Sequence, residues 1–222
     1  MRSDLGIGLD ALAPAEMARV LIAGQRAALE AVDVAREAIG RAAARMAETL
    51  GAGGRLAYGG AGSSALMAAA DALELGGTFG VSPERILILM AGGLPVDARM
   101  PGASEDDEAA GRAAAAVLDA RDLMIAVSAS GRTPYALGLA RAARDRGAAV
   151  IAIANVPGAP LLALADVPVC LPTPPEIVAG STRLGAGTAQ KAALNAMSTI
   201  MGALTGRIHD GFMVGLVADN AK

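Results

Sequence analysis

Short apolar runs alternate with longer helix-like segments along most of this 222-residue chain. The apolar runs lie near residues 55–58, 86–90, 123–127, 149–154 and 167–171, and the helix-like segments near 63–75, 104–120, 133–146 and 185–204. Strands that are apolar throughout, with helices between them, indicate a parallel sheet that is covered on both faces. The sequence therefore predicts an α/β fold, a three-layer sandwich with a mainly parallel sheet.

A different pattern precedes the first strand. Residues 14–50 are rich in Ala, Glu, Arg, Met and Leu, and their apolar residues recur at the three-to-four spacing of one or two long helices. The run Gly51-Ala-Gly-Gly54 is a stop signal. We expect residues 1–50 to form an N-terminal helical segment that packs on a single unit formed by residues 51–222.

Composition narrows the classes of function. A formal charge of −3, an aromatic content of 2% and the absence of Trp offer neither a basic patch nor a stacking platform for nucleic acid. The single Cys170 and the single His209 exclude an internal disulfide and the common zinc arrangements, which suits a reducing compartment. With neither a signal-peptide pattern nor an apolar run of membrane-spanning length, we expect a cytoplasmic protein without membrane contact.

Two loops rich in small and hydroxyl residues carry the strongest functional signal. They are Gly59-Gly-Ala-Gly-Ser-Ser64 and Ser128-Ala-Ser-Gly-Arg-Thr133, and each follows an apolar run and begins a helix-like one. Small residues let the backbone close around an anion, and a helix N-terminus adds free N–H groups and a positive dipole end. The loops predict a bound phosphorylated small molecule. The candidate binding residues are Gly62, Ser63, Ser64, Ser128, Ser130 and Thr133.

These loops allow two other interpretations. The hydroxyls could simply cap helices, although two such loops at one sheet edge favour a shared anion. The run Gly60-Ala-Gly-Ser-Ser-Ala65 also fits a relaxed dinucleotide-binding fingerprint. That site would need an acidic residue after the second strand, where Ala91-Gly-Gly93 stands instead.

Four motifs resemble those of one enzyme family. They are Tyr58-Gly-Gly-Ala-Gly-Ser-Ser64, Asp71-Ala-Leu-Glu-Leu-Gly-Gly-Thr-Phe-Gly80, Ser128-Ala-Ser-Gly-Arg-Thr-Pro-Tyr135 and Gly180-Ser-Thr-Arg-Leu-Gly-Ala-Gly-Thr-Ala-Gln-Lys191. In this order they resemble the N-acetylmuramic acid 6-phosphate etherases, which belong to the sugar isomerase (SIS) domain superfamily. The likeness extends from about Leu12 to Lys222, and the chain departs from the family pattern at Leu66, Gly185, Gly211 and Gly215.

The resemblance implies both a fold and an activity. The fold would be a SIS-type, flavodoxin-like sandwich preceded by long N-terminal helices. The activity would be that of a lyase in cell-wall recycling, which cleaves the lactyl ether to give N-acetylglucosamine 6-phosphate and D-lactate without metal, nucleotide or other cofactor. Family members are typically homodimers, and pockets in this superfamily are often completed by the partner subunit.

By the same resemblance, Glu74 would protonate the departing lactate and Glu105 would take the proton from C2. Asp106 or Asp107 could replace Glu105, whose stretch could also be ordinary acidic charge at a helix start. Glu74 was expected at the end of an apolar helix, before Gly76-Gly77, where a negative charge is unfavourable and therefore suggests function.

Four further residues each have two possible roles. Glu176 is either a loop carboxylate or a contact to sugar hydroxyls. Ser181 and Thr182 either cap helix 185–204 or reach the sugar, and Lys191 either pairs with a site carboxylate or is a surface charge. For the whole protein, the alternatives are an aldose–ketose isomerase acting on a sugar phosphate and a non-catalytic regulator that binds one. Retention of both Glu74 and Glu105 argues against the regulator.

Overall fold

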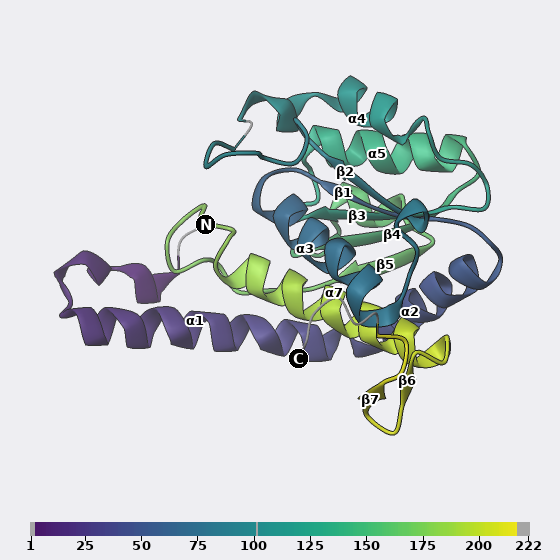
Figure 1. Ribbon diagram of the computed structural model, residues 1–222. Coiled ribbons are helices and arrows are strands. Elements are labelled where there is room, and N and C mark those ends of the chain that lie inside the picture. The colour runs from purple at the N-terminus through teal and green to yellow at the C-terminus, as the bar shows by residue number, and fades with distance from the viewer. Residues whose placement is uncertain (1–2, 101, 217–222) are drawn as a thin grey trace.

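The computed structural model describes residues 3–100 and 102–216 and is built around one parallel sheet (Figure 1). Its strands are β1 (Leu56–Gly60), β2 (Ile86–Met90), β3 (Leu123–Ser128), β4 (Ala149–Ala154) and β5 (Val167–Cys170). They lie in the order β2-β1-β3-β4-β5 with all pairs parallel, which is the flavodoxin-like order. The predicted α/β fold is confirmed.

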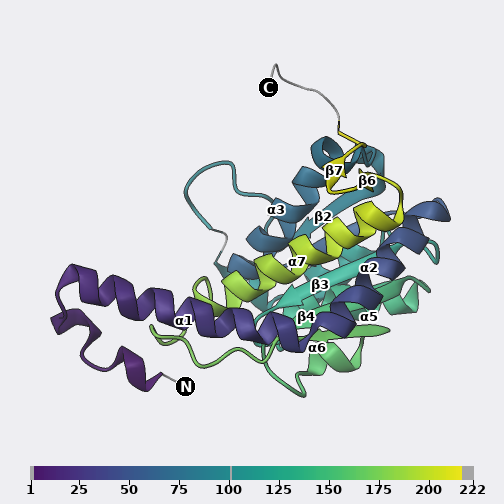
Figure 2. The same ribbon diagram turned by 90° about the horizontal axis from the view of Figure 1, so that it is seen from below.

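Helices cover both faces of the sheet (Figures 1 and 2). They are α1 (Pro14–Val34), α2 (Arg36–Gly51), α3 (Gly62–Phe79), α4 (Glu108–Ala115), α5 (Pro134–Asp145), α6 (Pro160–Ala163) and α7 (Gly185–Leu204). Along β3, Leu123, Ile125 and Val127 face the core shared with α2, α3 and α7. Met124 and Ala126 face the core shared with α4, α5 and α6.

Small residues bring the helices close together. A β-carbon on Gly111 of α4 would stand 2.2 Å from the carbonyl oxygen of Tyr135, and one on Gly138 of α5 would stand 2.3 Å from that of Glu108. The two helices therefore touch through backbone, which only glycine allows. In this way an Ala- and Gly-rich sequence reaches dense packing with few aromatic side chains.

The N-terminal segment is a pair of helices. The predicted run 14–50 divides at Ala35 into α1 and α2. Helix α2 contributes Ala42, Ala43 and Met46 to the main core, whereas the N-terminal part of α1 projects beyond the body of the molecule in both views. Two short 3₁₀ turns, Asp4–Gly6 and Leu9–Ala11, precede α1.

Two predicted helix boundaries were wrong. Segment 104–120 divides into a 3₁₀ turn, Ala103–Asp106, and the shorter α4, because Asp107 caps a new helix by accepting from the Ala110 N–H at 2.8 Å. Helix α3 continues past Gly76 and Gly77 and ends at Gly80, a glycine with φ of 61°. Its last turn is held by Phe79, which packs on Gly202 of α7.

The chain after α7 forms a small hairpin of β6 (Ile208–His209) and β7 (Phe212–Met213). A further 3₁₀ turn, Pro83–Arg85, leads into β2. In residues 3–100 and 102–216, every helix is too short or too polar to cross a membrane. Residues 217–222, the last part of the sequence likeness, lie outside the described residues.

Candidate functional site

The two hydroxyl-rich loops lie side by side at the carboxyl edge of the sheet. Strands β1 and β3 are neighbours, and Gly60 is in register with Val127 at the end of the pair. A β-carbon on Gly60 would stand 2.4 Å from the Val127 carbonyl oxygen, so the close approach of these backbones requires glycine there. In sheets of this kind, ligands bind at the carboxyl edge.

The second loop is organised by its own hydroxyls. Ser128 is buried, and its Oγ lies 2.8 Å from Oγ1 of Thr133 and accepts from the Gly131 N–H at 3.1 Å. Ser130 is exposed, and its Oγ accepts from the Arg132 N–H at 3.1 Å. The loop is thus a preformed turn that presents Ser130 outward.

The helix N-termini at this edge differ in how they are capped. Helices α3 and α5, which begin at the two loops, have no side-chain cap in the described chain. The N-terminus of α7 is occupied instead, because Glu176 accepts from the Gly185 and Ala186 N–H groups, both at 2.9 Å. Open N–H groups at α3 and α5 are the arrangement that an incoming anion needs.

The structure places Glu105 beside the first loop. A β-carbon on Gly62 would stand 3.7 Å from Oε2 of Glu105, so this carboxylate lies over the start of α3. Asp107 caps α4, and the exposed Asp106 lies at the end of the same 3₁₀ turn as Glu105. Of the three acidic residues considered for the base, Glu105 is the one found against the first loop.

Glu74 lies far from both loops along α3. It follows Gly62 by twelve residues on the continuous helix α3, which separates them by about 18 Å along the helix axis. Its side chain is exposed, in the interior of the helix and not at the helix end that the sequence indicated. Within one chain, therefore, Glu74 and the two hydroxyl-rich loops are not brought together.

A cavity of about 350 Å³ opens next to the second loop. Three predicted site residues line it, namely Ser130, Glu176 and Thr182. Thr182 is exposed, and its carbonyl oxygen accepts from the Gly187 N–H at 2.8 Å, so it belongs to the turn that leads into α7. The cavity joins the second loop to the Gly180–Lys191 motif.

The remaining candidates are less central. Ser64 is buried and Ser63 half-buried in the first turn of α3. The cap of α7 is Glu176, so the capping role considered for Ser181 and Thr182 is taken by a carboxylate. Lys191 is exposed on the second turn of α7.

The structure adds two residues that the sequence interpretation missed. Asn155 follows β4 and lines the cavity, and its Oδ1 accepts from Nε2 of Gln190 at 2.8 Å. Both side chains are buried. A signal for Asn155 was present, because it is the first polar residue after an apolar strand and therefore falls at the carboxyl edge. Gln190 gave none, since its partner is distant in sequence.

A buried carboxyl lies one helical turn before Glu74. Asp71 accepts hydrogen bonds from Nδ2 of Asn195 and Oγ of Ser198, both at 2.8 Å, and from the Tyr58 hydroxyl at 3.1 Å. Burial raises the pKa of Asp71 above its ordinary value, although these bonds oppose the rise. The group ties α3 to α7 and β1.

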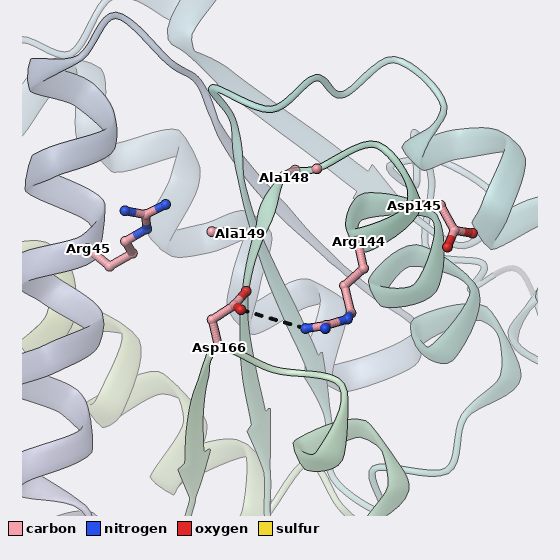
Figure 3. A pocket seen from close by; sticks show the side chains of 7 residues that line it. Arg45, Arg144, Asp145, Ala148, Ala149 and Asp166 are labelled. Carbon is pink, nitrogen blue, oxygen red and sulfur yellow. Dashed lines mark ion pairs between the residues drawn. The ribbon is translucent and has the colours of Figure 1, made fainter.

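A larger cavity, of about 730 Å³, lies at the opposite edge of the sheet, where β4 and β5 begin (Figure 3). Arg144 points toward Asp166 there, with an N–O distance of 3.6 Å, while Arg45 and Asp145 line other parts of the wall. None of its lining residues belongs to the two loops. The candidate site is therefore the carboxyl edge.

Comparison with known proteins identifies the class to which the chain belongs. The model of the SIS domain family matches residues 22–155, which include both loops, Glu105 and Asn155. A phosphoheptose isomerase from Neisseria gonorrhoeae shares the fold, with a TM-score of 0.60 and 22% identity over 85% of this chain and 97% of that one. The protein is thus of the SIS domain class.

Curated relatives define the family more narrowly. The N-acetylmuramic acid 6-phosphate etherase of Deinococcus radiodurans is 46% identical over 216 residues, or 96% of this chain and 71% of the relative. That of Rubrobacter xylanophilus is 41% identical over 228 residues, or 100% of this chain and 74% of the relative. This chain belongs to the N-acetylmuramic acid 6-phosphate etherase family.

Proposed function

We propose that this protein is a carbon–oxygen lyase that cleaves the lactyl ether of N-acetylmuramic acid 6-phosphate to give N-acetylglucosamine 6-phosphate and D-lactate. The observation that carries the proposal is the identity of up to 46% with an etherase across nearly the whole chain. The cytoplasmic setting expected from the sequence stays part of the proposal.

The two loops would hold the phosphate. The uncapped N-termini of α3 and α5 supply N–H groups and the positive ends of two helix dipoles, and Ser130 adds an outward hydroxyl. Gly62, Ser63 and Ser64 lie in the first turn of α3, where N–H groups have no helical partner. The negative charge of the substrate phosphate would thus be balanced by the dipoles of α3 and α5.

Glu105 would act as the base. With the sugar in its open-chain form, the Glu105 carboxylate removes the proton at C2, next to the C1 aldehyde, and an enolate forms. Its place over the start of α3 supports this role, because the base must reach the sugar that the phosphate anchors. The enolate then expels lactate from C3, and the C3–O bond breaks.

Glu74 would protonate the departing alkoxide and then take a proton from the water that adds at C3 to give the product hydroxyl, while protonated Glu105 returns the proton to C2. About 18 Å of helix separates Glu74 from the loop on its own chain, so we place it in the site of a second subunit. Leu73 beside it is 65% exposed, and an exposed apolar side chain next to this carboxylate favours contact with a second copy of the chain.

A homodimer with shared active sites is therefore part of the proposal. Helix α1, which projects at its N-terminal end, supports it. On this helix, Ile22 is 52% exposed and Leu29 is 43% exposed. Apolar side chains on a projecting helix are the kind of surface that a second copy covers.

The direct test is D-lactate release when the purified protein is incubated with N-acetylmuramic acid 6-phosphate. We expect lactate and N-acetylglucosamine 6-phosphate in equal amounts. The matched control is unphosphorylated N-acetylmuramic acid, which lacks the group that the loops bind. Turnover of a plain aldose phosphate without lactate would instead identify an isomerase, and binding without turnover of either would identify a regulator.

A further inference from the structure

A buried amide, Asn155, lines the cavity and is bonded to a second buried amide, Gln190, and one hydrogen-bonding group of each lacks a partner. Asn155 is 5% exposed and Gln190 is fully buried, and a single hydrogen bond of 2.8 Å joins Oδ1 of Asn155 to Nε2 of Gln190. Among the described residues, Nδ2 of Asn155 and Oε1 of Gln190 have no partner. Leaving a buried donor unpaired is costly, so such a group calls for an explanation.

The amide of Asn155 is held rigidly next to the phosphate loop. Its backbone N–H donates to the Ala129 carbonyl at 3.0 Å, and Ala129 immediately precedes Ser130. Gln190, buried in α7, fixes the other end of the side chain. Asn155 also lines the cavity, so an acceptor bound there lies next to the residue whose Nδ2 lacks a partner.

The lining of the cavity limits what that acceptor is. Ala129, Val156, Pro174, Pro175 and Ala186 give it apolar walls, and neither Lys nor Arg is among its lining residues. The one charged lining group is the half-buried carboxylate of Glu176. A second carboxylate, such as that of the lactyl group, would be repelled. A neutral carbonyl with a small apolar group attached fits both the donor and the walls.

We propose that Asn155, positioned by Gln190, recognises the acetamido group of the substrate. The acetamido carbonyl oxygen accepts from Nδ2 of Asn155, and the methyl group contacts the apolar wall formed by Val156 and Pro174. The inference rests on the proposed function, and it makes Asn155 the residue that distinguishes an N-acetylated sugar phosphate from a plain one.

The test compares two ligands that differ in this group. Calorimetry measures the affinity for N-acetylglucosamine 6-phosphate and for glucose 6-phosphate on the wild type, Asn155→Leu and the double variant Asn155→Leu/Gln190→Leu. We expect the wild type to favour the acetylated ligand by roughly fivefold or more, as the loss of a hydrogen bond would predict. Both variants should lose this preference while keeping their affinity for glucose 6-phosphate.

The double variant guards against misfolding, because replacing both amides by apolar groups leaves no buried polar group unpaired. Thr173→Val is the matched control on the same cavity wall and should keep the preference. A preference that survives in the double variant, an equal loss of affinity for both ligands, or a wild type that binds the two equally would overturn this inference alone. A wild type that binds neither phosphosugar would count against the proposed function instead.

Discussion

Glu105 and Glu74 have different surroundings, and the proposed roles assign them to different steps. Removing the base should prevent loss of the C2 hydrogen, whereas removing the acid should prevent departure of lactate only. We expect Glu74→Gln to exchange the C2 hydrogen with deuterated solvent but release no lactate, and Glu105→Gln to do neither. Rate losses of roughly 10²–10⁴ are the expected scale, and an NMR time course in heavy water measures both events.

Asp107 offers a matched control for this experiment. It is an acidic neighbour of Glu105, but it caps α4, and Asn is an equally good cap, so Asp107→Asn should leave both stability and exchange close to the wild type. Exchange in Glu105→Gln at the wild-type rate would exclude Glu105 as the base and direct attention to Asp106.

Helices α3 and α7 are joined through the buried carboxyl of Asp71. This group should make the stability of the folded protein depend on pH. Burial raises the folded-state pKa of Asp71, so the native chain keeps a proton that the unfolded chain has lost. Stability from this group is complete below about pH 4, the ordinary carboxyl range, and is lost as pH rises through the raised pKa. In Asp71→Asn, the side-chain amide can donate to Tyr58 and still accept from Asn195 and Ser198.

We therefore expect Asp71→Asn to become more stable relative to the wild type as pH rises above about 4, and the difference to level off beyond the raised pKa. Urea unfolding at a series of pH values measures this difference. Asp10→Asn, which changes an exposed carboxylate, is the control and should follow the wild type at every pH. Parallel curves for wild type and Asp71→Asn would show that Asp71 has the same pKa in both states.

Elements determined by local sequence patterns could be predicted, whereas features determined by tertiary contacts could not. The strands were predictable because a strand buried on both faces must be apolar throughout, as β3 and β4 are. The length of α3 was not, because Gly76 and Gly77 locally favour a stop, and the packing of Phe79 on Gly202 outweighs that preference.

In the candidate site, too, local features could be predicted and features that depend on tertiary contacts could not. The two loops could be identified from local sequence, since strand, small residues and helix follow one another within a few positions. The capping of α7 by Glu176 and the pairing of Asn155 with Gln190 depend on how segments meet in space. The separation of Glu74 from the loops appeared only when α3 proved continuous.

For the whole molecule, the decisive question is whether one active site draws on two chains. If Glu105 of one subunit acts with Glu74 of the other, then a mixed dimer of Glu74→Gln and Glu105→Gln chains contains one site with both glutamates intact and one site with neither. Random pairing makes half of the dimers mixed, so about a quarter of the wild-type activity should return. Each variant alone should be nearly inactive.

The experiment co-expresses the two variants with different affinity tags, isolates the mixed dimer by sequential purification and measures D-lactate release. In the isolated mixed dimer, half of the sites should be active, which is a larger signal than the random mixture gives. A site built within one chain predicts the opposite result, because every chain of the mixed dimer then lacks one glutamate. Sedimentation should also be used to measure the oligomeric state of the wild type. A wild-type monomer that is active would rule out the shared site, regardless of the activity of the mixed dimer.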